Sequence, residues 1–295
     1  MIERDELLKN SVIIAAHADD EILWFNSIAA DVDRILVVYC DFWAHPDLGR
    51  RRKAVFADYP RQIECLGIDE SGAAGCADWS APMLTDFGIA LGYEANRRAL
   101  TRIAKKSLSM VSAYDPAKVA TESVSEAYRS NFDAIYAALE PRLRADMNVF
   151  THNPWGEYGH EEHIQVFRVL EKLRDRIGFR LWMSNYCTER AMPLAMRYFS
   201  GTPDEYVRLR CDKEFAGAVA DVYRKHGCWT WVENWAWFED ECFMEAPREH
   251  APHKAHDRLF PLNFFAIDRE VQRRGWLPLA LTATAATVGL VAFTE

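Results

Sequence analysis

The sequence lacks an excess of positive charge. Its 295 residues include 35 lysines and arginines against 44 aspartates and glutamates, which gives a formal net charge of −9. Without a basic surplus the chain has no overall field for gripping a phosphate backbone, so nucleic-acid binding is not expected. Compositional bias is missing as well, because 49% hydrophobic and 27% charged residues are ordinary values for a globular protein.

The sequence also has no C-x-x-C motif, and its first residues do not have the pattern of a secretory signal. The seven cysteines are an odd number, are scattered along the chain and include no C-x-x-C pair. This distribution argues against a disulfide framework and against a cysteine-rich zinc module. The amino terminus, MIERDELLKN, has acidic residues where a signal peptide needs a basic region and an apolar run. We therefore expect a cytoplasmic protein with reduced cysteines.

One long uncharged stretch lies at the end of the chain. Residues 276–294 contain no charged side chain, and Arg273 and Arg274 precede them, which is about the length and flank of a membrane anchor. Pro278, Gly289 and several threonines dilute the stretch, however. A buried terminal segment is the favoured interpretation, and membrane contact is the alternative.

Short apolar runs predict a parallel sheet. Residues 11–16 and 34–40 have the continuous apolar character of strands buried on both faces, and residues 21–30 between them repeat at helical spacing. A strand, a helix and a strand in this order form a βαβ unit, which indicates an α/β fold with helices flanking a mostly parallel sheet. Two further strands are predicted at residues 147–151 and 181–184, and two further helices at residues 132–144 and 163–176.

The character of the chain changes after residue 190. Four tryptophans crowd into nine residues, and their alternation favours strands with one buried face, with one or two rings left to line a pocket: Trp229, Trp231, Trp235 and Trp237. We predict a core of residues 1–190, an aromatic-rich substrate-side subdomain of residues 191–275 packed on it, and an apolar carboxyl-terminal segment of residues 276–295.

The first motif that carries chemistry follows the first predicted strand. Residues 16–21 read A-H-A-D-D-E, and the carboxyl edge of a parallel sheet is where ligands bind. A short loop at a strand end can aim the His17 imidazole and the Asp20 carboxylate at one point, a pair suited to zinc. Asp19 projects elsewhere and is then free for proton transfer. Taken alone, the motif also fits a helix amino-terminal cap formed by one of its aspartates.

The second motif runs from the third predicted strand into a helix. Residues 151–163 read T-H-N-P-W-G-E-Y-G-H-E-E-H, so His160 and His163 are three residues apart and share one side of a first helical turn. If His163 joins His17 and Asp20, the shell has two imidazoles, one carboxylate and an open position, as in catalytic zinc sites. Alone, the pair also fits a solvated helix start, but both motifs fall on the same edge of one sheet.

Together the two motifs resemble the paired signature of the PIG-L/LmbE-like deacetylases, which are zinc-dependent enzymes that remove N-acyl groups, usually acetyl, from amino sugars. The family's first motif is usually A-H-P-D-D-E, and Ala18 replaces the proline here. Such a change loosens the loop without removing a functional side chain. The resemblance covers residues 11–185 and implies a Rossmann-like fold.

The resemblance also implies roles for single residues. It implies that His17, Asp20 and His163 hold the zinc, that Asp19 is the general base, and that His160 stabilises the oxyanion or protonates the leaving amine. The chemistry agrees, because bound zinc lowers the pKa of water toward about 7 and a nearby carboxylate can accept the proton. Because two nitrogens and one carboxylate suit several divalent metals, zinc is not the only candidate.

Side chains outside the zinc shell are candidates for substrate contact. Arg50, Arg51 and Arg52 follow the second predicted strand and are able to hold a diphosphate, although such runs usually belong to a solvated helix. Trp155, within the second motif, is a further candidate. Pro252 would break a helix that aligned the three nearby histidines, so we interpret these as a surface loop: His250, His253 and His256.

The sequence thus predicts a zinc-dependent N-deacetylase that acts on a small N-acetylated sugar, free or linked to a nucleotide or lipid. One alternative is an amidase acting on another N-acylated substrate, such as a thiol conjugate. Another is a non-catalytic metal-binding protein, against which Asp19 argues, because a structural site needs no spare carboxylate. A dinucleotide-dependent enzyme is not expected, since A-H-A-D-D-E stands where a G-x-G-x-x-G turn would be required. The oligomeric state is left open.

Overall fold

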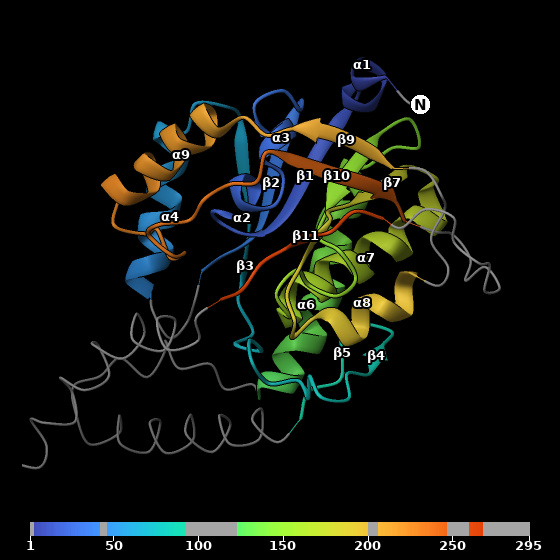
Figure 1. Ribbon diagram of the computed structural model, residues 1–295. Helices are drawn as coiled ribbons and strands as arrows, with labels where there is room; N and C mark the ends of the chain where they lie inside the picture. The colour runs from blue at the N-terminus through green and yellow to red at the C-terminus, as the bar shows by residue number, and fades with distance from the viewer. Residues whose placement is uncertain (1–2, 42–45, 93–122, 200–205, 247–259, 268–295) are drawn as a thin grey trace, which may run out of the picture.

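A central β-sheet organises the part of the chain that the computed structural model describes, which comprises residues 3–41, 46–92, 123–199, 206–246 and 260–267 (Figure 1). Within these residues the sheet has seven strands, in the spatial order β3 (Ile63–Asp69), β2 (Arg34–Asp41), β1 (Ser11–His17), β6 (Asn148–Thr151), β7 (Arg180–Met183), β10 (Asp240–Glu245) and β9 (Val207–Arg210). The first five strands are parallel, whereas β10 runs antiparallel to both of its neighbours. The predicted α/β class with a mostly parallel sheet is confirmed.

Helices cover both faces of this sheet (Figure 1). Strand β1 shows why, because Val12 and Ile14 contribute to one apolar cluster while Ile13 and Ala15 contribute to the other. The first cluster includes residues of α6 (Val124–Leu139), α7 (Glu161–Ile177) and α8 (Met192–Phe199), and the second includes residues of α1 (Arg4–Leu8), α2 (Asp20–Leu23), α3 (Asn26–Ala29), α4 (Pro46–Asp58) and α9 (Lys213–Lys225). Smaller elements are η2 (Glu140–Arg142), β4 (Leu84–Thr85), β5 (Gly88–Ile89), β8 (Tyr186–Cys187) and β11 (Asn263–Phe264).

The strand order reverses direction at β1. The chain goes from β1 to β2 on one side, and later returns to place β6 on the other side of β1. The carboxyl ends of β1 and β6 therefore meet at the switch point of the sheet, where open α/β folds bind their ligands. Both chemical motifs begin at these two strand ends.

The single helix predicted over residues 21–30 is wrong. The structure has two short helices instead, because the backbone N–H groups of Asn26 and Ser27 donate to the Glu241 carboxylate at 3.0 and 2.8 Å. In an unbroken helix these amides would bond to carbonyls one turn back, and one of those, the Ile22 carbonyl, accepts the indole N–H of Trp237 at 2.8 Å. The carboxylate of Glu241 thus accepts hydrogen bonds from the first two backbone N–H groups of α3, as an N-cap side chain would.

The region after residue 190 extends the same sheet, because β10 pairs with β7. The prediction that the four tryptophans lie on strands is wrong: residues 227–239 form a loop between α9 and β10. Their rings are partly buried and pack against the apolar cluster around α2, α3 and α9. The domain divisions at residues 190 and 275 stay predictions.

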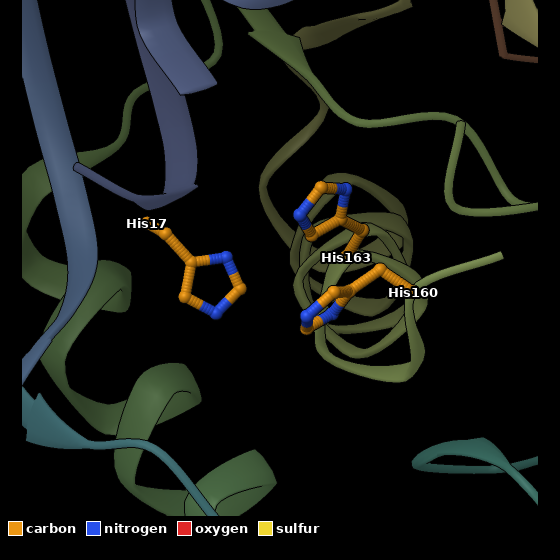
Figure 2. A group of neighbouring side chains, drawn as sticks. All are labelled: His17, His160 and His163. Atoms are coloured by element: carbon orange, nitrogen blue, oxygen red, sulfur yellow. The ribbon is translucent and has the colours of Figure 1, made fainter. Parts of the chain in front are cut away.

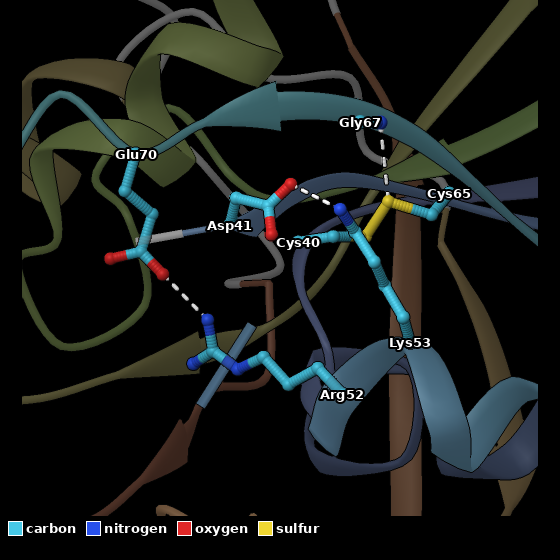
Figure 3. Close-up of a disulfide and its surroundings, with 7 residues drawn as sticks. All are labelled: Cys40, Asp41, Arg52, Lys53, Cys65, Gly67 and Glu70. Atoms are coloured by element: carbon cyan, nitrogen blue, oxygen red, sulfur yellow. Dashed lines mark hydrogen bonds and ion pairs between the residues drawn. A yellow bond between two sulfur atoms is a disulfide. The ribbon is translucent and has the colours of Figure 1, made fainter. Parts of the chain in front are cut away.

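The cysteines correct a further expectation. Cys40 on β2 and Cys65 on β3 are joined by a disulfide, so the prediction that all cysteines are reduced is wrong for this pair (Figure 3). The other five are free and buried. The bond links the outermost parallel strand of the sheet to its neighbour.

Some expectations concern residues that the structure does not describe. The apolar segment 276–294 and the histidines His250, His253 and His256 lie outside the described ranges. Among the helices that are described, none combines the length and the apolar character needed to cross a bilayer.

Candidate metal centre

The predicted metal ligands meet at the carboxyl ends of β1 and β6. His17 is the last residue of β1, Asp20 the first of α2, and His163 lies in the first turn of α7. One carboxylate oxygen, Asp20 Oδ2, lies 3.3 Å from His17 Nδ1 and 3.3 Å from His163 Nε2. Figure 2 shows the His17 ring facing the rings of His160 and His163. All three predicted ligands are buried.

The ring nitrogens of His163 have different partners. Nδ1 lies 2.7 Å from Glu157 Oε2 and donates its hydrogen to this carboxylate. Nε2 is buried and makes no hydrogen bond to any described residue. A carboxylate that holds one nitrogen while the other is left for a cation is the arrangement found around metal-binding histidines. The surroundings of His163 are therefore those expected of a metal-binding histidine.

The charges around Asp20 favour a cation at the same place. Burial alone would raise the pKa of the Asp20 carboxyl, but the surrounding imidazoles, His163 foremost, hold it well below its usual value. Conversely, burial lowers the pKa of His163, and the carboxylates of Asp20 and Glu157 raise it to about 9. Positive charge between these groups, carried by a proton or by a metal ion, stabilises the site.

His17 is oriented by a second carboxylate. Its Nε2 lies 3.0 Å from Glu162 Oε2, and the other oxygen of Glu162 accepts hydrogen bonds from the backbone and hydroxyl of Ser71 at 2.7 and 2.6 Å. Burial lowers the pKa of His17, but hydrogen bonds to Asp20 and Glu162 raise it to about 10, so Nε2 donates to Glu162 and Nδ1 donates to Asp20 Oδ2. Once the Nδ1 proton is lost, this nitrogen would offer its lone pair to a metal ion. Glu162 thus fixes the orientation of the His17 ring.

A third buried imidazole, His152, lies close to the same oxygen. Its Nε2 is 3.4 Å from Asp20 Oδ2, but this nitrogen accepts the backbone N–H of Ala16 at 2.8 Å. Its Nδ1 then donates to Glu157 Oε2 at 3.0 Å. Because both nitrogens are occupied, His152 acts as a support that ties the ends of β1 and β6 together.

Across the described residues, three groups of three side chains bring ligand atoms within 4.8 Å of one another. They are His17, His160 and His163; Asp20, His152 and His163; and His17, Glu70 and Glu162. The predicted ligands fall in the first two groups, so buried side chains of this region are able to hold a metal ion. No single group equals the predicted set of His17, Asp20 and His163.

Asp19 stands beside the ligands in a strained conformation. Its φ of 97° is in the left-handed region, which non-glycine residues rarely adopt, and its backbone N–H donates to Glu21 Oε2 at 3.0 Å. Its side chain caps no helix; Oδ2 accepts the Thr230 hydroxyl at 2.9 Å. Burial, and then the neighbouring Asp20, raises the pKa of Asp19 to about 7. This carboxylate is poised to exchange a proton near neutral pH.

His160 is the N-cap residue of α7. Its Nδ1 accepts the Glu162 amide at 3.3 Å, and its ring centroid lies 4.7 Å from that of His17 and 4.5 Å from that of His163. Burial, and then the charge of His163, holds the pKa of His160 well below its usual value. In the neutral ring that results, Nε2 carries the hydrogen.

A tight turn brings His160 back to the strand end. Gly156 has a φ of +66°, and a β-carbon at this position would stand 2.5 Å from the His160 carbonyl. Glu157, the next residue, also has a positive φ, of 50°, and burial would raise its pKa, yet His152 and His163 lower it to about 2. Glu157 is thus an ionised, buried support for two imidazoles.

The three predicted substrate arginines point to different places. Arg50 is exposed and pairs with Asp47, and Arg51 donates to the Gly227 carbonyl at 3.1 Å. Arg52 is buried and pairs with Glu70 at 2.6 Å, as Figure 3 shows. Since Glu70 belongs to a group with His17, only Arg52 of the three borders the candidate centre.

Trp155 lies away from the surface. It is fully buried, and its indole N–H donates to the Tyr186 carbonyl at 2.8 Å. This position argues against the predicted contact with substrate. The supports that the sequence analysis missed are His152, Glu157 and Thr230. One signal for Glu157 was present, an acidic residue between two histidines in a glycine-rich turn.

Neither a protein-family model nor a curated protein sequence matches this chain. The interpretation of the centre therefore depends on its geometry and on the two sequence motifs.

Proposed function

We propose that this protein is a metal-dependent hydrolase that removes an N-acetyl group from an amino sugar, free or conjugated to a nucleotide or lipid. The substrate class and the Rossmann-like assignment come from the resemblance to the PIG-L/LmbE-like deacetylases. The observation that carries the proposal is the position of Asp20 Oδ2, which lies 3.3 Å from His17 Nδ1 and 3.3 Å from His163 Nε2.

His17, Asp20 and His163 would hold the metal, for which we propose zinc. Two imidazole nitrogens and one carboxylate oxygen are the donor set of catalytic zinc sites. When bound, the ion supplies Lewis-acid chemistry, which lowers the pKa of water toward about 7 and polarises a carbonyl group. The supports Glu157 and Glu162 hold the two rings in place for this purpose.

Asp19 would act as the general base. Its carboxylate adjoins the ligand Asp20 in the chain, and one of its oxygens is held by Thr230. No described residue donates a hydrogen bond to the other oxygen, Oδ1, which is thus left to accept the proton of an attacking water. The backbone N–H bond to Glu21 maintains the strained conformation that directs the side chain.

His160 would stabilise the negative charge that develops on the carbonyl oxygen. Its ring, which carries the Nε2–H, has its centroid 4.7 Å from that of His17 and 5.6 Å from that of Tyr158. A neutral imidazole donor stabilises a carbonyl oxygen as it becomes negative. The leaving amine would take the proton that Asp19 accepted from the attacking water. His160 thus supplies a donor while Asp19 supplies an acceptor.

The test is acetate release from N-acetylhexosamines, free and nucleotide-linked, by protein reconstituted with zinc. Asp19→Asn keeps the shape of the side chain and should retain one metal per chain while losing about 10²–10⁴ of the rate. Asp133→Asn, at an exposed position of α6, is the matched control and should keep full activity.

Two results would contradict the proposal. Failure of the protein to bind one metal ion per chain would contradict the metal centre itself. Release of other amides without release of acetate from any N-acetylated sugar would keep a metal hydrolase but reject the sugar substrate.

A further inference from the structure

The loop of residues 227–239 lies against the candidate centre. Thr230 donates its hydroxyl to Asp19 Oδ2 at 2.9 Å, and Trp237 donates its indole N–H to the Ile22 carbonyl at 2.8 Å. The loop is therefore anchored to both α2 and the residue just before it. The segment between the two anchors contains Trp231.

Trp231 contacts two aromatic rings that themselves contact residues of the candidate centre. Its ring centroid is 5.2 Å from that of Trp24, whose indole N–H donates to Asp20 Oδ1 at 2.8 Å. The centroid is also 5.2 Å from that of Tyr158. The Tyr158 ring in turn lies 5.6 Å from His160 and 5.4 Å from His163.

Three indole donors of this loop have no acceptor among the described residues. The indole nitrogens of Trp229, Trp231 and Trp235 are buried and, within the described part of the chain, make no hydrogen bond. Buried donors are paired in the large majority of cases, because an unpaired one loses its bond to water without replacement. If these rings served packing alone, phenylalanine would fill the same role without an unpaired N–H.

The polar groups around Trp231 indicate what kind of ligand fits. A hydroxyl at Thr230, a carboxylate at Asp19 and an indole N–H at Trp231 offer both donors and acceptors beside a half-buried aromatic ring. An aromatic face with a few polar groups at its edge suits a ring that carries C–H groups on its face and hydroxyl groups on its rim. This is the chemistry of a sugar.

We propose that Trp231 is the specificity-determining platform on which the sugar ring of the substrate lies, with the N-acyl group directed toward Asp19 and His160. This inference rests on the proposed function and deepens it. It assigns the choice of sugar to the loop between α9 and β10, outside the two motifs that carry the chemistry.

Kinetics with two substrates test the platform. Trp231→Ala in the zinc-loaded protein should raise KM for an N-acetylhexosamine at least tenfold while leaving kcat/KM for the acyclic amide N-acetylethanolamine within twofold. Trp231→Phe keeps a ring and should give an intermediate KM. Trp229 packs on Tyr223 instead, with 6.4 Å between the ring centroids, so Trp229→Phe is the matched control. It removes the same kind of unpaired N–H from the same loop and should change neither value more than twofold.

A binding measurement separates this inference from the proposed function. Saturation-transfer NMR with the free hexosamine should give signal with wild-type protein, with or without zinc, and none with Trp231→Ala, while thermal melting shows both to be folded. If hexosamine binds in this way but no substrate releases acetate, the platform stands and the proposed reaction fails. The platform would be overturned by equal losses on both substrates, by an equal effect of Trp229→Phe, or by preferred binding of an aromatic base such as adenine.

Discussion

Replacing Glu157 by glutamine should weaken metal binding and the fold together. The carboxylate accepts four hydrogen bonds, from the rings of His152 and His163, the amide of Asn153 and the hydroxyl of Ser184. A glutamine has the same shape but only one oxygen. If that oxygen serves the two imidazoles, the side-chain NH₂ faces the Asn153 amide, and two donors then oppose each other.

The magnitude follows from this count. One buried donor without an acceptor costs about 1–3 kcal/mol, and loss of the charge weakens two charge-assisted bonds. We expect Glu157→Gln to lower the free energy of unfolding by about 2–4 kcal/mol. We also expect a loss of about 10–100-fold in zinc affinity, because this carboxylate orients the His163 ring.

Glu241→Gln is the matched control. Glu241 is equally buried and accepts four hydrogen bonds, from the amides of Asn26 and Ser27 and the hydroxyls of Ser27 and Tyr186. It should show a similar loss of stability in urea unfolding but an unchanged zinc affinity in a chelator competition assay. The reasoning is refuted if Glu157→Gln binds zinc within twofold of the wild-type value, or if both variants lose affinity equally.

Three further outcomes are expected. Adding zinc at about 100 times its Kd to chelator-treated protein should stabilise the fold by about 2.7 kcal/mol; a melting temperature that zinc does not raise would contradict the centre. Thr230→Val should lower kcat with little change in zinc content, because Asp19 loses its hydrogen-bond donor, and Thr230→Ser should restore most of the rate; equal effects of both variants would indicate packing instead. Thiol labelling after denaturation without reductant should find five reactive cysteines, and reduction of the Cys40–Cys65 bond should cost about 3.5 kcal/mol for its separation of 25 residues; seven labelled thiols would disprove the bond.

The strands of the sheet differ in how readily the sequence predicts them. Strands β1 and β2 are buried on both faces, so their apolar runs are unbroken and the prediction is confirmed. Strand β3 is an edge strand with exposed residues such as Glu64 and Gly67, and its sequence has no comparable run. Because one side of an edge strand is exposed to solvent, β3 lacks the unbroken apolar run from which buried strands are predicted.

Long-range contacts explain the other differences. The helix break before Asn26 depends on Glu241, which lies 215 residues away in the chain, and no local pattern indicates it. The meeting of His17, Asp20 and His163 is different, because parallel strands place their carboxyl ends on one edge wherever they lie in the sequence. Which ring nitrogen faces Asp20 was unpredictable, since it depends on the carboxylates of Glu157 and Glu162.

The hydrogen bond between the Ala16 amide and His152 has a consequence for how the centre assembles during folding. It joins residues 136 apart in the chain, so closing this loop requires a large loss of chain entropy before any contact compensates for it. His17 and Asp20 are near neighbours and can approach early, whereas His163 arrives only when β6 docks beside β1. A metal ion held by these three ligands would therefore favour the docked state of β6, and metal supply would raise the population of the native sheet over partly assembled chains.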